Sequence, residues 1–299
     1  MAATPQPGIF ALGTRSHHHL QYDVGEDVDL AALRTALGSV REQATTVGGV
    51  NVVVGLGAEL CARLAPASLP TGVAPFETLR GRDGVVVPAD QHDLWIWLHG
   101  AGPDSVFDLA RRVDRALGGL ATVVGEQPSF TYLASQDLTG FEDGTENPPL
   151  DVAARLVVVP ADEPGAGSSV VLLQRWVHDL DAFDRLDPEA KDQVIGRCLA
   201  DGREIDEAER SPRSHISRVA IEDEDGHELE IFRRSTAYGG VITNGLVFVA
   251  FSPDVERLAT MLHRMVGEDG PRDNLTDVSR CVASAWYVTP PVEVFTPAG

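Results

Sequence analysis

The chain has little positive charge, few cysteines and no long apolar run. Its 299 residues carry 24 Lys and Arg against 45 Asp and Glu, a net charge of −21. Because this charge repels phosphate groups, we exclude nucleic acid and anionic lipid as partners. No segment approaches the roughly 20 apolar residues of a membrane helix, and the N-terminus lacks the basic and apolar regions of a secretion signal. We therefore expect a soluble, cytoplasmic protein with no membrane contact.

The sequence also lacks the motifs of the commonest enzyme classes. Cys61, Cys198 and Cys281 are far apart and odd in number, which is typical of reduced structural thiols. There is no HExxH, no Cys/His zinc spacing, no Gly-rich phosphate loop and no GxSxG motif. The run His17–His19 does not indicate a metal site, because neighbouring residues of a strand face opposite sides. Zinc-enzyme, nucleotide-binding and common hydrolase functions therefore have no support.

Apolar residues with strand and helix periodicity alternate along both halves of the chain. After an extended segment at 8–24, the predicted strands are 50–56, 94–100, 121–125, 169–179, 246–252 and 283–289, and the predicted helices are 29–43, 105–117, 189–199 and 255–266. The β-α-β order therefore repeats in the two halves. This duplication predicts an α+β fold of two ferredoxin-like (split β-α-β) modules, residues 1–147 and 148–299, joined at Glu146–Pro149.

A second pattern lies in the segment Ser214–Ser235. The pair Asp225-Gly226 separates two alternating apolar arms, which predicts a β-hairpin. Such a hairpin places His215 near Arg233 and Arg234 at its open end. Because a buried guanidinium is costly without an anion, at least one of these arginines is expected to face solvent or to hold a carboxylate or an anionic ligand. A solvated strand end explains the same residues without any function.

A third pattern is the loop Gly140-Phe141-Glu142-Asp143-Gly144. Its two glycines allow backbone conformations that other residues avoid, so one carboxylate can point inward beside a ligand while its neighbour stays in water. Asp-Gly turns are also common in solvated loops, so this loop alone does not establish a site. It lacks the alternating acidic residues of a calcium loop.

Taken together, these patterns resemble the dye-decolourising peroxidases, haem enzymes whose hallmark is a GxxDG loop. In that family a histidine downstream of the loop binds haem iron, and an arginine further on lies on the opposite face of the haem. Asp143, His215 and Arg233 have the family's spacing. The resemblance extends to the segments 245–251 and 273–290, and it is strongest to the compact bacterial B-type subgroup.

The resemblance implies a site around haem b (iron protoporphyrin IX). It implies that His215 is the proximal ligand of the iron, Asp143 the distal carboxylate and Arg233 the distal guanidinium. Asp277 is expected to accept the other ring N–H of His215, and Arg218 is expected to pair with a haem propionate.

Three further positions follow from the resemblance. Leu246 and Phe248 are expected to line the distal pocket. Ser235 stands where many B-type members have asparagine, and its hydroxyl is expected to hydrogen-bond a catalytic water with a shorter reach. The implied function is a haem-dependent peroxidase that reduces hydrogen peroxide through a high-valent iron-oxo intermediate and oxidises dyes, phenols or other small one-electron reductants.

Two other functions fit the same residues. A haem-binding or haem-delivery protein would keep the fold and His215 with little turnover, and a ferredoxin-like module would hold no cofactor. A carrier needs the iron ligand but neither a distal acid nor a guanidinium, so Asp143 with Arg233 favours catalysis. The family also implies a symmetric homo-oligomer.

Overall fold

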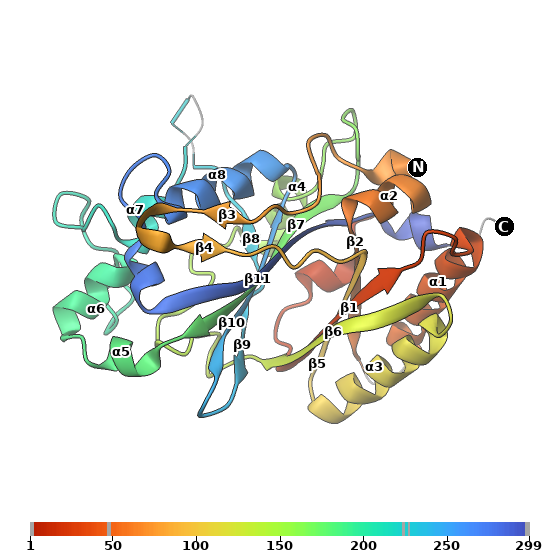
Figure 1. Cartoon of the computed structure of the whole chain (residues 1–299), viewed down its shortest axis with the longest axis horizontal. Coiled ribbons are helices and arrows are strands. Elements are labelled where there is room, and N and C mark those ends of the chain that lie inside the picture. Colours follow the sequence, from red (N-terminus) through yellow and green to blue (C-terminus); the bar gives the residue numbers. More distant parts are fainter. Residues whose placement is uncertain (1–2, 47–48, 223–224, 227, 297–299) are drawn as a thin grey trace.

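Two antiparallel sheets form the centre of the computed structural model, which describes residues 3–46, 49–222, 225–226 and 228–296 (Figure 1). The strands of the first sheet lie in the order β2 (Asn51–Leu56), β5 (Leu94–Gly100), β1 (Ser16–Val24) and β6 (Ala121–Phe130). The strands of the second sheet lie in the order β9 (Thr236–Gly239), β10 (Asn244–Ser252), β7 (Ser169–His178) and β11 (Ser279–Thr289). In each sheet the strand that comes first along the chain lies between the third and the fourth. This is the split β-α-β order, so the predicted α+β fold with its internal duplication is confirmed.

Two narrow seams close the two sheets into a barrel. One joins β6 to β9 through the pair Phe130 and Ala237, and the other joins β2 to β11 through Leu56 and Val288. The short strand β8 (Phe232–Arg233) adds to β10. Every strand of the barrel therefore has an inner and an outer face.

Helices cover the outer face of each sheet. Figure 1 shows α1 and α3 beside the N-terminal strands and α5 to α8 beside the C-terminal ones. The helices are α1 (Leu30–Thr46), α2 (Ala58–Leu64), α3 (Pro103–Leu117), α4 (Leu150–Leu156), α5 (Leu180–Asp184), α6 (Pro188–Ile195), α7 (His215–Val219) and α8 (Val255–Val266). The remaining elements are β3 (Leu79–Arg80), β4 (Val86–Val87) and the 3-10 turns η1 (Pro7–Phe10), η2 (Pro66–Ser68), η3 (Arg82–Gly84), η4 (Asn274–Asp277) and η5 (Val292–Phe295). Within the described part of the chain, no helix has the length and apolar character needed to cross a bilayer.

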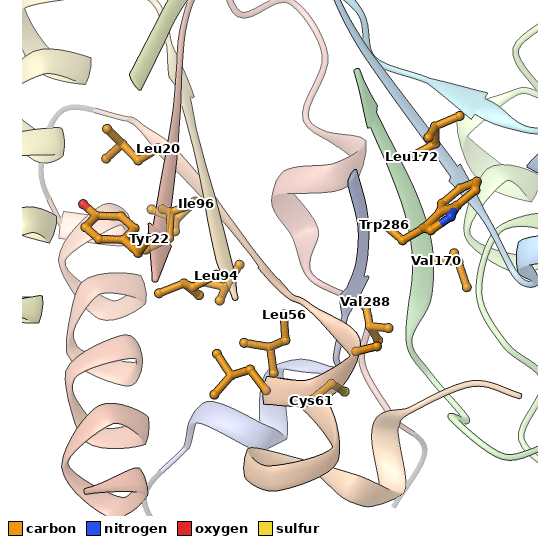
Figure 2. Packing of buried hydrophobic residues seen from close by; sticks show 14 of the residues in the cluster. Leu20, Tyr22, Leu56, Cys61, Leu94, Ile96, Val170, Leu172, Trp286 and Val288 are labelled. Atoms are coloured by element: carbon orange, nitrogen blue, oxygen red, sulfur yellow. The ribbon is translucent and has the colours of Figure 1, made fainter. Parts of the chain in front are cut away.

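Strand alternation divides the core into two layers. All seven residues of β5 are buried, and its side chains point alternately outward and inward. Leu94 and Ile96 belong to the outer cluster under the helices, part of which Figure 2 shows. Trp95 and Trp97 belong to the cluster that fills the barrel. The fully apolar pattern of this strand thus reflects burial on both faces.

Some of the polar groups in the barrel interior satisfy one another, although both ring nitrogens of His19 and the indole N–H of Trp95 have no hydrogen-bond partner among the described residues. Trp97 donates its indole N–H to Nδ1 of His17 at 3.2 Å, and the Nε2 atom of His17 lies 3.2 Å from the hydroxyl of Thr131. Arg234 donates to the carbonyls of Ile9 and Ala11 and lies over the Trp97 ring, 5.0 Å from its centroid. Carbonyls and an indole face therefore take the place of the anion that a buried guanidinium usually requires.

The predicted hairpin within Ser214–Ser235 is shorter than the alternation suggested. Ile221 accepts a backbone hydrogen bond from Leu229, and an antiparallel bridge joins Glu222 to Glu228, whereas residues 223–224 and 227 lie outside the described residues. His215 belongs to helix α7 rather than to a strand. The expectation that a hairpin brings His215 to Arg233 and Arg234 is therefore wrong.

Stability should decrease in mild acid because of the buried imidazoles. Burial, assisted by the charge of Arg234, lowers the pKa of His17 from 6.5 to about 4. Between these pH values the unfolded chain binds a proton that the folded chain excludes. The contribution of the neutral His17 ring to the free energy of unfolding is therefore complete above pH 6.5 and is lost as the pH falls towards 4. Between pH 6.5 and 4 the loss in the free energy of unfolding that comes from His17 should reach roughly 3 kcal/mol, and we expect His17→Phe to remove it. Urea titration at several pH values measures this free energy. His263→Phe, at an exposed histidine, should leave that dependence unchanged.

Candidate active site

A cavity of about 670 Å³ lies between the outer face of the C-terminal sheet and helices α7 and α8. Its volume is within the roughly 300–1,000 Å³ range of small-molecule and cofactor sites. The apolar part of its wall comes from strands and helices: Leu172, Trp176, Leu246, Phe248, Leu262 and Met265. The polar part comes from α7, β8 and two loops, 136–146 and 197–204. Among the residues expected around a cofactor, Asp143, His215, Arg233, Leu246 and Phe248 all line this one cavity.

His215 enters the cavity from the first turn of α7. Ser214 is the N-cap of this helix, and its buried hydroxyl accepts the backbone N–H of Ser217, which fixes the backbone at His215. The Nδ1 atom of His215 lies 2.7 Å from Oδ2 of Asp273, and the Asp273 side chain is completely buried. No hydrogen bond to Nε2 is found among the described residues. A carboxylate on Nδ1 makes Nδ1 the protonated nitrogen, so the Nε2 lone pair is available to a ligand in the cavity.

The expectation that Asp277 accepts this hydrogen bond is wrong, because Asp273 occupies the position. Asp273 caps η4 by accepting the backbone N–H of Leu275 on its other oxygen. Asp277 lies at the far end of the same short turn, where its carboxylate accepts hydrogen bonds from Arg213 and Arg272. Only three residues separate the buried carboxylate of Asp273 from the solvated one of Asp277, and a turn this short has no apolar periodicity that would distinguish them.

Asp143 and Arg233 form the second charged group of the cavity. The Nε atom of Arg233 lies 3.9 Å from Oδ1 of Asp143, and about four-fifths of each side chain is shielded from solvent. This separation is too long for a hydrogen bond and leaves donor and acceptor atoms free to engage a small polar molecule. No hydrogen bond or ion pair joins either residue to His215 in the described chain.

Asn147 holds the Asp143 loop against β8. Its side-chain oxygen accepts the backbone N–H of Arg233 at 2.8 Å, and its amide donates to the Arg233 carbonyl at 2.9 Å. Gly144 has a φ of +78°, and a Cβ atom there would lie 2.7 Å from the Asn147 amide nitrogen. The second glycine of the loop is therefore required both for its backbone conformation and for this contact.

Charged side chains line the part of the cavity near the loop 197–204. Arg197 is paired with Glu146 and Glu204, and Arg210 is paired with Glu204. Burial together with the neighbouring carboxylates, Glu146 among them, raises the pKa of Glu228. This region therefore contains both signs of charge.

The two models of the Dyp-type peroxidase family cover nearly the whole chain. The N-terminal model matches residues 8–131, and the C-terminal model matches residues 134–294. The chain belongs to the Dyp-type peroxidase family. The expected enzyme class, a peroxidase, is thereby confirmed.

Individual members of the family resemble the chain over almost its full length. A dye-decolorizing peroxidase of Rhodococcus erythropolis is 32% identical over 304 residues, which cover 97% of this chain and 87% of that protein. The structure of a Dyp-type peroxidase protein of Shewanella oneidensis has a TM-score of 0.91 at 27% identity, covering 99% of this chain and 98% of that one. DyPB of Rhodococcus jostii has a TM-score of 0.88 at 30% identity with the same coverage.

Besides Asp277, two residues expected at the site of this Dyp-type peroxidase do not line the cavity. The guanidinium of Arg218 is engaged by Asp269 and by the carbonyl of Arg264. The Ser235 hydroxyl is buried, and it has no hydrogen-bond partner among the described residues. The expectations that Arg218 meets a propionate and that Ser235 contacts a catalytic water therefore lack support from the geometry.

Removing the Asn147 side chain should loosen the Asp143 loop. Asn147→Ala deletes two hydrogen bonds to the backbone of Arg233, so we expect the free energy of unfolding to fall by roughly 1–3 kcal/mol. Urea denaturation of the full chain measures this change. Asn51→Ala is the matched control, because that amide makes a single 3.3 Å bond to the carbonyl of His99 and should matter less. Equal effects of the two substitutions would contradict a special role for Asn147.

Proposed function

We propose that the chain is a haem-dependent peroxidase that holds haem b in the cavity, reduces hydrogen peroxide and oxidises dyes, phenols or other small one-electron donors. One observation carries this proposal. A single cavity receives both His215, whose Nε2 lone pair is available, and the pair Asp143 and Arg233. A haem-delivery protein would need only the first of these features.

The residues present fit a haem. The histidine has its second nitrogen held by a buried carboxylate, which is the usual arrangement of a metal-binding imidazole. The wall is largely apolar, with Leu246 and Phe248 on one side and residues of α8 on another, as a tetrapyrrole requires. Besides Arg233, the arginines that line the cavity in the described chain are Arg197 and Arg210. Although both are paired with glutamates, they are the candidates to meet the propionates, because Arg218 does not line the cavity. A related DypB structure of Rhodococcus jostii is a complex with heme.

His215 and Asp273 would hold the group in place. When bound, haem supplies a redox-active iron that takes oxidising equivalents from peroxide. The negative charge of Asp273 at Nδ1 makes the Nε2 lone pair more basic and fixes the plane of the ring. Because Asp273 also caps η4, its carboxylate cannot rotate away without losing the bond to Leu275.

Asp143 and Arg233 would act on peroxide itself. Breaking the O–O bond requires a proton to leave one peroxide oxygen and to reach the other. A carboxylate oxygen of Asp143 can accept that proton and return it. Arg233, which stays charged, stabilises the negative charge on the hydroperoxide and on the departing oxygen. The loop contacts keep both groups in place before peroxide arrives, so little reorganisation is needed.

The wider setting of the enzyme is part of the proposal. We propose a cytoplasmic protein of two modules, residues 1–147 and 148–299, which assembles as a homo-oligomer. The strand order of the two sheets supports the modules. Val241 and Ile242 lie fully exposed at the β9–β10 turn, and such apolar side chains are typical of surfaces that meet another subunit. A relative from Mycobacterium smegmatis is described as encapsulated.

Substitutions at the Asp143 and Arg233 pair test the peroxidase function. We expect Asp143→Ala and Arg233→Ala each to lower the rate constant for the reaction with hydrogen peroxide by roughly 10²–10³-fold. Stopped-flow absorbance with one equivalent of peroxide measures this rate. Glu142→Gln, in the same loop but exposed, is the matched control and should react like the parent chain. A parent chain that binds haem without reacting with peroxide would instead identify a haem carrier.

Substitutions at two neighbouring aspartates test the haem site. Asp273→Asn should weaken haem binding by roughly 10–100-fold, because the carboxylate on Nδ1 of His215 is lost. Asp277→Asn should bind haem normally, since Asp277 does not line the cavity and its ion pairs within the described residues are with Arg213 and Arg272. Titration followed by the Soret band gives the affinities. His215→Ala defines the level without the ligand, and an unchanged Soret band in that variant would overturn the assignment.

A further inference from the structure

A chain of three largely buried polar side chains, Asp137, His178 and Ser279, lines the cavity beside the Asp143 loop. The Nε2 atom of His178 lies 3.0 Å from Oδ2 of Asp137, and its Nδ1 atom lies 2.8 Å from the hydroxyl of Ser279. The His178 side chain is only 5% exposed. His178 ends β7 and Ser279 begins β11, and the two residues are paired across the sheet. The imidazole therefore has a fixed position on the rigid edge of the barrel.

The other end of this chain shapes the loop. Oδ1 of Asp137 accepts the backbone N–H of Thr139 at 2.8 Å and its hydroxyl at 2.5 Å. The Asp137 backbone also bonds to Phe141 and Gly140, closing a tight turn just before Asp143. One carboxylate thus uses one oxygen to form the turn and the other to bind the sheet through His178.

The Asp137 carboxylate stays charged in this buried position. Burial alone raises its pKa, but hydrogen bonds from His178 and Thr139 outweigh that effect, so the pKa is lowered. Nε2 of His178 is then the donor to Asp137. The other ring nitrogen of His178, Nδ1, is hydrogen-bonded to the Ser279 hydroxyl. A hydrogen bond to an ionised acceptor is stronger than one between neutral groups, so this contact is well suited to holding a loop.

The remaining contacts of the loop act at other points. Phe141 packs against Phe183 in a small apolar cluster with Val194 and Val278, and Asn147 binds the backbone of Arg233. An apolar contact of this kind holds the loop against Phe183 but does not fix the orientation of its backbone. At Asp143 itself the backbone N–H donates to the carbonyl of Ser135, and the charged contact at Asp137 ties the preceding turn to the sheet.

We propose that His178 is a positioning residue for peroxide reduction: by binding Asp137 from the sheet, it keeps Asp143 beside Arg233. This inference rests on the proposed function, because it assigns His178 a role only through Asp143.

Hydrogen exchange of the full chain, with and without haem, tests the contact directly. In His178→Ala we expect the amides of Asp137, Gly140 and Asp143, which are hydrogen-bonded within the loop, to exchange at least about tenfold faster. His178→Gln should restore most of the protection, because the glutamine amide can donate to Asp137. The matched control is His18→Ala, which removes another buried histidine, bonded at 2.7 Å to Glu126 on the N-terminal sheet, and should leave the loop unchanged.

The reaction with peroxide completes the test. With each variant saturated with haem, His178→Ala should lower the rate constant with peroxide about tenfold or more, and His178→Gln should recover most of the rate. Unchanged loop protection in His178→Ala would overturn the inference, as would a loosened loop that reacts at the parent rate while Asp143→Ala reacts slowly. A parent rate in Asp143→Ala would instead refute the proposed function, together with the role given to His178. If His178→Ala does not fold, Asp137→Asn, which removes the charge that binds His178, must show the same pair of effects.

Discussion

The hydrogen bond between His215 and Asp273 is the interaction on which the site depends. Both residues lie at the beginning of a short helical turn: His215 follows the N-cap Ser214, and Asp273 is itself the N-cap of η4. The backbone N–H of Asn274 donates to the carbonyl of Arg213 at 2.7 Å and ties the two turns together. Capping fixes the backbone of each turn, so the carboxylate meets Nδ1 and leaves Nε2 to the cavity. The buried carboxyl group of Asp273 is tolerated because both of its oxygens take part in hydrogen bonds.

The other half of the site depends on a loop that is held at both ends. Asp137 binds the barrel before the loop, and Asn147 binds β8 after it. Between them, the positive φ angles of Gly140 and Gly144 give the chain the two sharp bends that a residue with a side chain would resist. The catalytic value of a carboxylate and a guanidinium comes from their being in place beforehand. Rigid anchoring of an irregular segment therefore serves the chemistry better than regular secondary structure would.

Residues with strong periodicity were predictable, and those positioned by short turns were not. The strand 94–100 and the helix 255–266 agree with the structure at both ends, because the strand begins with five consecutive apolar residues and the helix keeps a regular amphipathic spacing throughout. The strand predicted at 121–125 continues to Phe130 along the exposed edge of its sheet, where polar residues and a proline conceal it. Helix α7 is five residues long, too short to show a helical period, so the sequence pattern predicts a strand there. Asp273 was missed for the same reason: which of two nearby aspartates points inward depends on a cap, and only Asp273 lies before the turn.

Arg233 and Arg234 are neighbours in the sequence, yet the first belongs to the cavity and the second to the core of the barrel. Neighbouring residues of β8 and its extension face opposite sides, so Arg233 reaches the cavity while Arg234 enters the barrel. Inside, the charge of Arg234 adds to burial in lowering the pKa values of His17 and His99 to about 4 and about 2, so both rings stay neutral at physiological pH. Outside, Arg233 keeps its charge beside Asp143. A slip of one residue in the pairing of β8 with β10 would turn Arg233 into the barrel and Arg234 out to the cavity, so that neither guanidinium would keep the partners it has in this structure. The same register therefore sets both the stability of the core and the charge of the cavity.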